Sequence, residues 1–209
     1  MKDSNNKTTS NKSQILFLAG IAVTALVLGL LAATYITSGD KKPKGITSIG
    51  GDFTLQSHQG PVSLQDLKGK VVPLYFGFAS CPDVCPTSLG ILAAALNQLP
   101  EDQQKQIQPV FVSVDPDRDT PEKLAAYADA FYPGMLGLTA DKATIDDVTW
   151  RYRALYKIVP MEDSAMGYTI DHSSIIYIIG RNGVIQSLAQ HGSTPTEVLA
   201  KIKQALTDT

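Results

Sequence analysis

The chain is poor in cysteine and histidine, with only two cysteines and three histidines among 209 residues. Two cysteines are too few for a small scaffold held together by several disulfides, so we expect them to be functional residues. The sequence also lacks a basic stripe with interleaved aromatic residues, and its formal net charge is -2. This charge pattern argues against a nucleic-acid partner. No internal repeat is present, so a repeat architecture is not expected.

Charged residues are absent from residues 15–36, a run of 22 residues. A helix of this length can cross a bilayer core of roughly 30 Å, and the lysines before the run favour a cytoplasmic N-terminus. We therefore expect a retained transmembrane anchor. A cleavable signal peptide is the competing interpretation, which the length of the apolar run disfavours. No cysteine follows the run directly, which excludes anchoring through a lipid-modified cysteine.

The composition changes on both sides of this run and predicts four parts. Residues 1–14 form a short polar cytoplasmic tail, residues 15–36 the anchor, residues 37–49 a linker and residues 50–209 the folded domain. The folded domain then lies beyond the membrane, where disulfides are permitted. The N-terminal residues include lysines but no arginine-rich presequence, so a bacterial inner membrane, with the domain in the periplasm, is favoured over a mitochondrial location.

Hydrophobic patterns in the folded domain predict a hairpin followed by the order βα, βα, ββα. The apolar run 71–78 is typical of a strand covered on both faces, with Pro73 near its start. Thr120 and Thr194, each followed by a proline, are typical of helix starts. This order predicts a thioredoxin-like α/β fold, a mixed sheet with helices on both faces and an N-terminal hairpin extension. The expected elements are a hairpin from 53–55 and 62–64, strands at 71–78, 109–114, 174–179 and 184–188, and helices carrying apolar positions within 89–99, 124–131, 145–155 and 198–202.

Both cysteines, Cys81 and Cys85, lie at the predicted turn between the first core strand and its helix. Pro86 suits the first helical position, which places Cys85 at or beside the N-cap, where the helix dipole favours a thiolate. Helical residues four apart have Cβ atoms roughly 5–6 Å apart, a spacing that suits two sulfurs about 2.3 Å from one metal ion. A disulfide needs Cβ atoms nearer roughly 3.8 Å, so Cys81 must leave helical geometry to form one. The pair can therefore bind a soft metal ion or form a disulfide.

A third ligand is expected from His172, immediately before the predicted strand at 174–179. In a thioredoxin-like sheet, the loop before that strand faces the N-terminus of the first helix. Two thiolates and one imidazole suit copper best, because thiolates select Cu(I) and imidazole accommodates Cu(II). Zinc is the alternative, but three ligands without a fourth is the pattern of an open catalytic site. His58 and His191 lie in polar loops and are expected to be solvated.

Three motifs in this order resemble the Sco/SenC family: Cys81-Pro82-Asp83-Val84-Cys85-Pro86, Ser113-Val114-Asp115-Pro116-Asp117-Arg118-Asp119-Thr120-Pro121 and Asp171-His172-Ser173. The resemblance covers roughly residues 50–206 and the N-terminal anchor. It implies a membrane-anchored, thioredoxin-like copper chaperone that helps assemble the binuclear copper centre of cytochrome c oxidase. Cys81, Cys85 and His172 would then bind one copper ion per chain, as Cu(I), Cu(II) or both. The implied partners are an upstream copper donor and the oxidase subunit that holds the copper centre.

A second interpretation is a thiol–disulfide oxidoreductase that acts on extracytoplasmic protein cysteines, with Cys81 as the attacking thiol. The three residues between the cysteines argue against a general reductase, because thioredoxins have two. No proline directly precedes the predicted His172 strand, where thioredoxins carry one. A peroxidase is disfavoured because only one cysteine pair is present. A purely structural disulfide would close a very short loop and stabilise little.

Aspartates beside these motifs have roles that the sequence leaves open. Asp115 and Asp119, with Arg118, either form a turn held by a local ion pair or orient the site and dock a partner. Asp83 and Asp171 flank the expected ligands, and either could accept the imidazole N–H.

Overall fold

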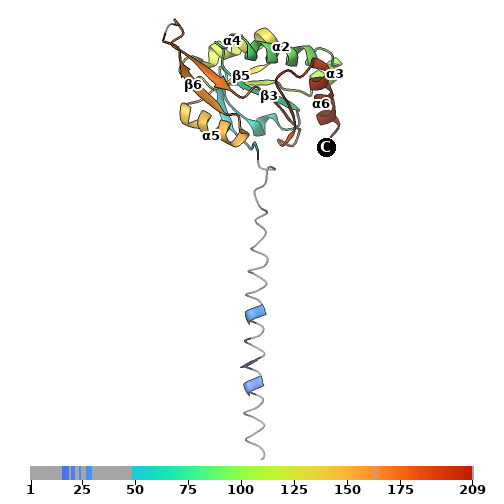
Figure 1. Cartoon of the computed structure of the whole chain (residues 1–209). Coiled ribbons are helices and arrows are strands. Elements are labelled where there is room, and N and C mark those ends of the chain that lie inside the picture. The colour runs from blue at the N-terminus through green and yellow to red at the C-terminus, as the bar shows by residue number, and fades with distance from the viewer. Residues whose placement is uncertain are drawn as a thin grey trace, which may run out of the picture. The chain divides into compact units, whose positions relative to one another are not determined.

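The described part of the domain consists of residues 49–162 and 164–208 in a computed structural model (Figure 1). Contacts within the chain group Ser48–Thr209 into one compact unit. The predicted anchor over residues 15–36 lies mostly outside the described residues, which near the N-terminus are 16–18, 20, 21, 24 and 27–29, all helical. Within the described residues, we find no helix with the length and apolar character needed to cross a membrane.

The elements of the domain follow the predicted order with some additions. The strands are β1 (Thr54–Ser57), β2 (Gly60–Ser63), β3 (Val72–Gly77), β4 (Val110–Ser113), β5 (Leu136–Leu138), β6 (Tyr156–Pro160), β7 (Tyr168–His172), β8 (Ile176–Ile179) and β9 (Ile185–Ala189). The helices are the 3₁₀ helix η2 (Leu64–Leu67) and the α-helices α2 (Val84–Leu96), α3 (Glu101–Gln104), α4 (Pro121–Phe131), α5 (Lys142–Tyr152) and α6 (Pro195–Thr207).

A mixed sheet of five strands, in the order β5-β4-β3-β8-β9, forms the centre of the domain. β3 pairs in parallel with β4 and antiparallel with β8. All residues of β3 are buried, as its continuous apolar sequence predicts for a central strand. Pro73 is the second residue of β3, near the strand's start as predicted. The predicted thioredoxin-like arrangement and the hairpin of β1 with β2 are confirmed.

Helices cover both faces of this sheet, with α2 and α4 on one side and α5 on the other (Figure 1). α6 packs against α2. Successive side chains of β3 point to opposite faces of the sheet. Tyr75 stacks on Phe111, with ring centroids 6.4 Å apart, whereas Phe76 packs against Tyr152 of α5 and Tyr177 of β8. Both hydrophobic layers therefore depend on β3, which leads directly into the cysteine turn.

Side-chain caps fix the starts of two helices where the sequence predicts them. The Thr120 hydroxyl accepts a hydrogen bond from the Lys123 N–H at the start of α4. Thr194 and Glu197 form a reciprocal capping box at the start of α6. These local bonds pair backbone N–H groups that the first turn of a helix leaves free.

The prediction that Leu155 continues the apolar face of the third helix is wrong. α5 ends at Tyr152, because Arg153 adopts a left-handed conformation with φ of 56°. Leu155 is 62% exposed. The chain then forms a second hairpin, β6 with β7, which the sequence patterns did not predict and which makes its own two-stranded sheet.

Gly137 of β5 allows α4 to pack closely against the sheet. A Cβ there would stand 2.5 Å from the Leu124 carbonyl carbon, and backbone cannot move away cheaply. We expect Gly137→Ala to lower the free energy of unfolding by about 2–3 kcal/mol. Urea denaturation of the purified chain measures this loss.

A matched control is Gly90→Ala in α2, where a Cβ meets nothing within 4 Å. This change should stabilise the domain by about 0.5–1 kcal/mol, because alanine favours the helix. Equal changes in the free energy of unfolding for Gly137→Ala and Gly90→Ala would contradict the close packing of α4 at Gly137.

Candidate metal centre

The cysteine turn joins β3 to α2 and differs from the prediction in one respect. α2 begins at Val84, so Cys85 is its second residue and Pro86 its third. The prediction that Pro86 opens the helix is wrong, because a proline is tolerated anywhere in the first turn, where N–H groups lack helical partners. Cys81 lies outside the helix, and its N–H donates to the Phe78 carbonyl at 3.2 Å. Cys81 therefore has the non-helical geometry that a disulfide with Cys85 requires.

His172 is the last residue of β7, opposite Tyr156 of β6. The imidazole packs edge-on against the rings of Tyr75 and Phe78, with centroids 6.0 Å and 5.9 Å away. Its Nδ1 lies 3.3 Å from the Ser173 carbonyl oxygen, which can accept the ring N–H. This contact leaves Nε2 with a free lone pair directed at the cysteines.

The structure brings Cys81, Cys85 and His172 together. Their potential ligand atoms all lie within 4.8 Å of one another, and Cys85 Sγ is 3.2 Å from His172 Nε2. Cys85 is fully buried, and Cys81 is 9% exposed. Two sulfurs and one imidazole nitrogen around a common point form a donor set for a soft metal ion.

Burial dominates the proton affinities of this cluster. Burial raises the pKa of the Cys85 thiol, and the neighbouring Cys81 raises it further. A hydrogen bond from the Phe78 backbone N–H lowers this pKa but does not outweigh burial. Burial also lowers the pKa of His172 below its ordinary value. In the metal-free protein, burial therefore opposes the thiolate that the helix N-terminus is expected to favour at Cys85. The Cys85 S–H can donate to neutral Nε2, and a metal ion would take the place of that proton.

Gly77 makes room for the buried sulfur. A Cβ on Gly77 would stand 2.6 Å from Cys85 Sγ, 3.0 Å from Phe111 and 3.1 Å from Tyr75. Glycine in a central strand sacrifices packing, and here the lost volume is filled by the sulfur. No motif identified from the sequence includes this requirement.

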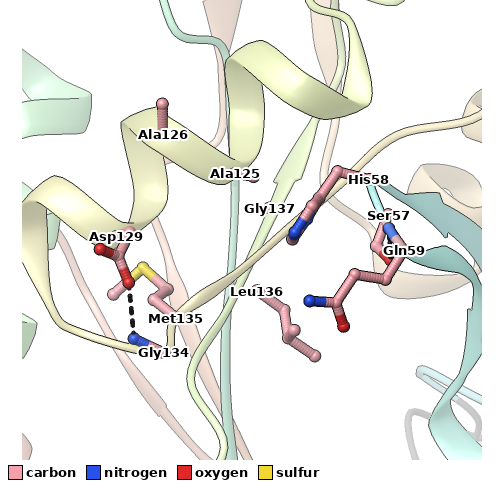
Figure 2. A pocket seen from close by; sticks show the side chains of 10 residues that line it. All are labelled: Ser57, His58, Gln59, Ala125, Ala126, Asp129, Gly134, Met135, Leu136 and Gly137. Carbon is pink, nitrogen blue, oxygen red and sulfur yellow. Dashed lines mark hydrogen bonds between the residues drawn. The ribbon is translucent and has the colours of Figure 1, made fainter.

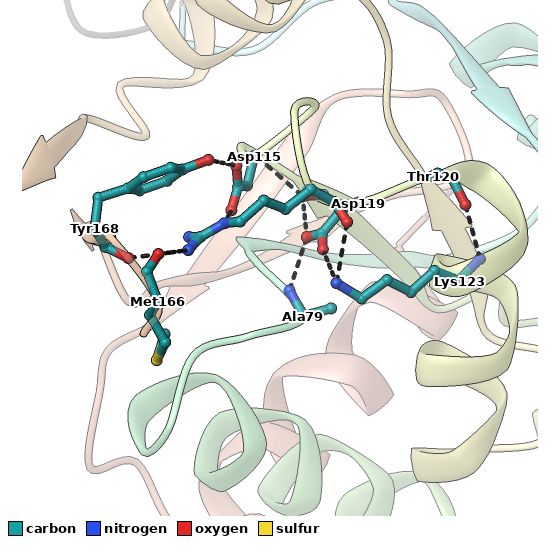
Figure 3. A network of polar contacts seen from close by, with 9 residues as sticks. Ala79, Asp115, Asp119, Thr120, Lys123, Met166 and Tyr168 are labelled. Atoms are coloured by element: carbon teal, nitrogen blue, oxygen red, sulfur yellow. Dashed lines mark hydrogen bonds and ion pairs between the residues drawn. The ribbon is translucent and has the colours of Figure 1, made fainter. Parts of the chain in front are cut away.

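Asp119 connects the turn after β4 to the cysteine turn (Figure 3). Its buried carboxylate accepts hydrogen bonds from the Ala79 N–H at 2.8 Å and from the Ser113 hydroxyl at 2.7 Å. Its other oxygen pairs with Lys123 Nζ at 2.8 Å. A buried carboxylate with both oxygens bonded holds its neighbours rigidly.

Asp115, seen beside Tyr168 in Figure 3, and Arg118 connect the same turn to β7. Arg118 pairs with Asp115 at 2.6 Å and donates to the Met166 and Tyr168 carbonyls at 3.1 Å and 2.9 Å. The guanidinium lies 3.6 Å from the centroid of the Tyr168 ring, whose hydroxyl donates to Asp115. The turn is thus more than a local ion pair, because it links the segments that carry the cysteines and His172.

The remaining polar residues singled out in the sequence lie outside the cluster. Asp83 and Asp171 are exposed, and the imidazole N–H faces Ser173 instead of either carboxylate. His58 and His191 are exposed, as expected.

Two hollows on the domain surface differ in their relation to the cluster. One, of about 320 Å³, lies beside His172 and is lined by Leu155, Tyr156, Lys157, Asp171, His172 and Ser173. The other, of about 440 Å³, lies between the β1–β2 turn and the α4–β5 segment and contains His58 but no cysteine (Figure 2). Its carboxylate, that of Asp129, accepts the Gly134 N–H at 2.8 Å.

A thioredoxin-like domain with two cysteines and one histidine around a common point defines a class of thiol proteins that can hold a soft metal ion. The chain belongs to the SCO1/SenC family, whose sequence model matches residues 41–207.

Individual relatives agree with this assignment. A SCO2-like protein of Rickettsia conorii is 40% identical over 152 residues, which are 72% of this chain and 74% of the relative. The structure of Bradyrhizobium japonicum ScoI with copper bound superimposes with a TM-score of 0.67 at 39% identity, covering 75% of this chain and 99% of that protein. The structure of BsSco, described as a member of the Sco family of cytochrome c oxidase assembly proteins with a disulfide switch, gives a TM-score of 0.62 at 26% identity, covering 78% and 96%.

The Asp119 carboxylate should stabilise both the fold and the cysteine turn. We expect Asp119→Asn to lower the free energy of unfolding by about 2 kcal/mol, because charge-assisted bonds to a buried group are lost. The Ala79 amide should also exchange its hydrogen faster, since its acceptor weakens.

Asp129→Asn is the matched control, because Asp129 is exposed and also accepts one backbone N–H. Its cost should stay below about 1 kcal/mol, with Ala79 exchange unchanged. An Asp119→Asn protein as stable as wild type would refute the role given to this carboxylate.

Proposed function

We propose that this chain is a membrane-anchored copper-binding protein that delivers copper to, or prepares the thiols of, the binuclear copper centre of cytochrome c oxidase. The observation that carries the proposal is the cluster of Cys81, Cys85 and His172, with ligand atoms within 4.8 Å of one another. The copper-bound Bradyrhizobium relative and the oxidase-assembly description of BsSco support it.

One copper ion per chain is the proposed cargo. The two sulfurs favour Cu(I), and the imidazole also accommodates Cu(II). His172 is held neutral by burial, so its nitrogen is available without losing a proton, whereas each thiol must lose one. A donor and an acceptor would approach the cluster near Cys81, the more exposed cysteine at 9%, and near His172, which lines a surface hollow.

The proposed anchor is the run at residues 15–36, preceded by a cytoplasmic tail at 1–14 and followed by a linker at 37–49. With this orientation, residues 50–209 would face the periplasm from a bacterial inner membrane. The proposed partners are an upstream copper donor and the oxidase subunit that receives the copper.

Thiol–disulfide exchange is the second candidate function. Cys81 lies outside the helix and is the more exposed cysteine, so it can attack a partner disulfide. Cys85 would then displace the partner from the mixed disulfide, leaving the pair oxidised and the partner with two thiols. This activity can serve copper delivery, because an acceptor needs reduced cysteines to bind copper.

Anaerobic titration of the reduced full-length chain with Cu(I) in detergent tests the copper site. We expect tight binding of one copper per chain, lost in Cys85→Ser and weakened on the order of a hundredfold or more in His172→Ala. The exposed His191 provides the matched control, since His191→Ala should bind copper as wild type does.

Thiol exchange with a small disulfide, measured on the same proteins, separates the two functions. Exchange should survive in His172→Ala and disappear in Cys85→Ser. Absence of copper binding in the wild type, together with exchange that is insensitive to His172, would reject the copper function and leave an oxidoreductase.

A further inference from the structure

Tyr75 carries a buried hydroxyl without a hydrogen-bond partner among the described residues. The side chain lies in β3 and is 0% exposed. Buried polar groups are almost always paired, because an unpaired one loses its bonds to water without compensation. A phenylalanine would fill the same apolar space without this cost, so the hydroxyl requires an explanation.

The hydroxyl belongs to a ring that contacts the metal cluster. Tyr75 and Gly77 are two residues apart on β3, so they face the same side of the sheet. The empty Cβ position of Gly77 lies 3.1 Å from Tyr75 Cε1 and 2.6 Å from Cys85 Sγ, so ring and sulfur flank one point. The same ring packs against the His172 imidazole.

The immediate surroundings of the phenol include Cys85. Burial is the main cause that raises the pKa of Tyr75, and Cys85 adds to it, whereas Ser88 and Ser174, whose hydroxyls lie near enough to interact with the phenol, oppose it. Within the described part of the chain, the buried hydroxyl of Tyr127 also lacks a hydrogen-bond partner, but the Tyr127 side chain as a whole is only half-buried. Tyr75, whose side chain is fully buried, is therefore a better candidate than Tyr127 to donate a hydrogen bond to Cys85.

In the metal-free cluster, this hydroxyl has no charged acceptor within hydrogen-bond distance among the described residues. Cys85 lies 3.2 Å from His172 Nε2 and can donate its S–H there. A thiol sulfur is a weak acceptor. When a metal ion replaces the thiol proton, the sulfur becomes a thiolate, and a hydrogen bond to a charged acceptor is roughly twice as strong as one between neutral groups.

We propose that Tyr75 is a positioning residue of the copper site, whose O–H donates a hydrogen bond to the Cys85 thiolate when copper is bound. This inference rests on the proposed copper function. The bond stabilises the thiolate relative to the protonated thiol, which tightens the binding of Cu(I). It also withdraws electron density from the sulfur, which raises the Cu(II)/Cu(I) reduction potential.

Tyr75→Phe tests the proposal, with Tyr177→Phe as matched control. Tyr177 is 1% exposed and also has an unpaired hydroxyl, but it packs with Phe76 and Tyr152 on the other face, and burial alone raises its pKa. Both metal-free variants should be as stable as the wild type or more stable, because each loses an unpaired polar group.

Copper should separate the two variants. In the reduced full-length chain, Cu(I) affinity should fall roughly tenfold or more in Tyr75→Phe and stay unchanged in Tyr177→Phe. In the Cu(II) form of Tyr75→Phe, the sulfur-to-copper charge-transfer band should move to lower energy, and the reduction potential should fall. A general packing defect would not give this spectral shift together with unchanged metal-free stability.

Three results would overturn the inference. The first is a Tyr75→Phe protein with wild-type copper affinity and spectrum, which would leave the copper function intact. The second is an equal loss of affinity in Tyr177→Phe. The third is a loss of metal-free stability in Tyr75→Phe, since the hydroxyl would then have a partner before copper arrives. A wild-type chain that binds no copper would reject the copper function and this inference together.

Discussion

The contact between Cys85 Sγ and His172 Nε2, at 3.2 Å, joins two parts of the fold that lie in separate sheets among the residues that the structure describes. Cys85 belongs to the helix that follows the central strand, whereas His172 belongs to a separate two-stranded sheet. The donor set exists only while these two sheets stay docked. Much of the polar structure around the cluster maintains that docking.

The turn after β4 keeps the two sheets docked through two buried carboxylates, which contact different segments. Asp119 holds the backbone before Cys81, and Asp115 with Arg118 holds the strand that leads to His172. Buried charges stabilise a structure only when their partners are complete, and both carboxylates have a cation and further donors. The result is a rigid base beneath a cluster that stays partly open on its outer side.

The sequence predicts well those features that neighbouring residues determine. The caps at Thr120 and Thr194, the buried strand before the cysteines and the order of the core elements all depend on local patterns. The β6–β7 hairpin was missed because its strands are partly exposed and do not alternate cleanly between buried and exposed residues. The burial that raises the Cys85 pKa could not be predicted from sequence, because it depends on the close approach of Gly77 to the sulfur in the folded chain. For the same reason, the contacts of Asp119 and Arg118 with segments distant in the sequence could not be predicted from the spacing of these residues.

The two cysteines are unequally buried, so one side of the cluster lies nearer to solvent than the other. Cys85 is sealed beneath the strand and the helix, whereas Cys81 borders solvent at 9% exposure. Cys81 is therefore the cysteine that an incoming ligand from another protein would reach first. If a metal ion leaves by stepwise ligand substitution, the bond to Cys81 can be replaced early, while the bond to Cys85 breaks last. Under the proposed copper function, the protein would then hold the ion by the innermost sulfur until the receiving site has supplied a ligand.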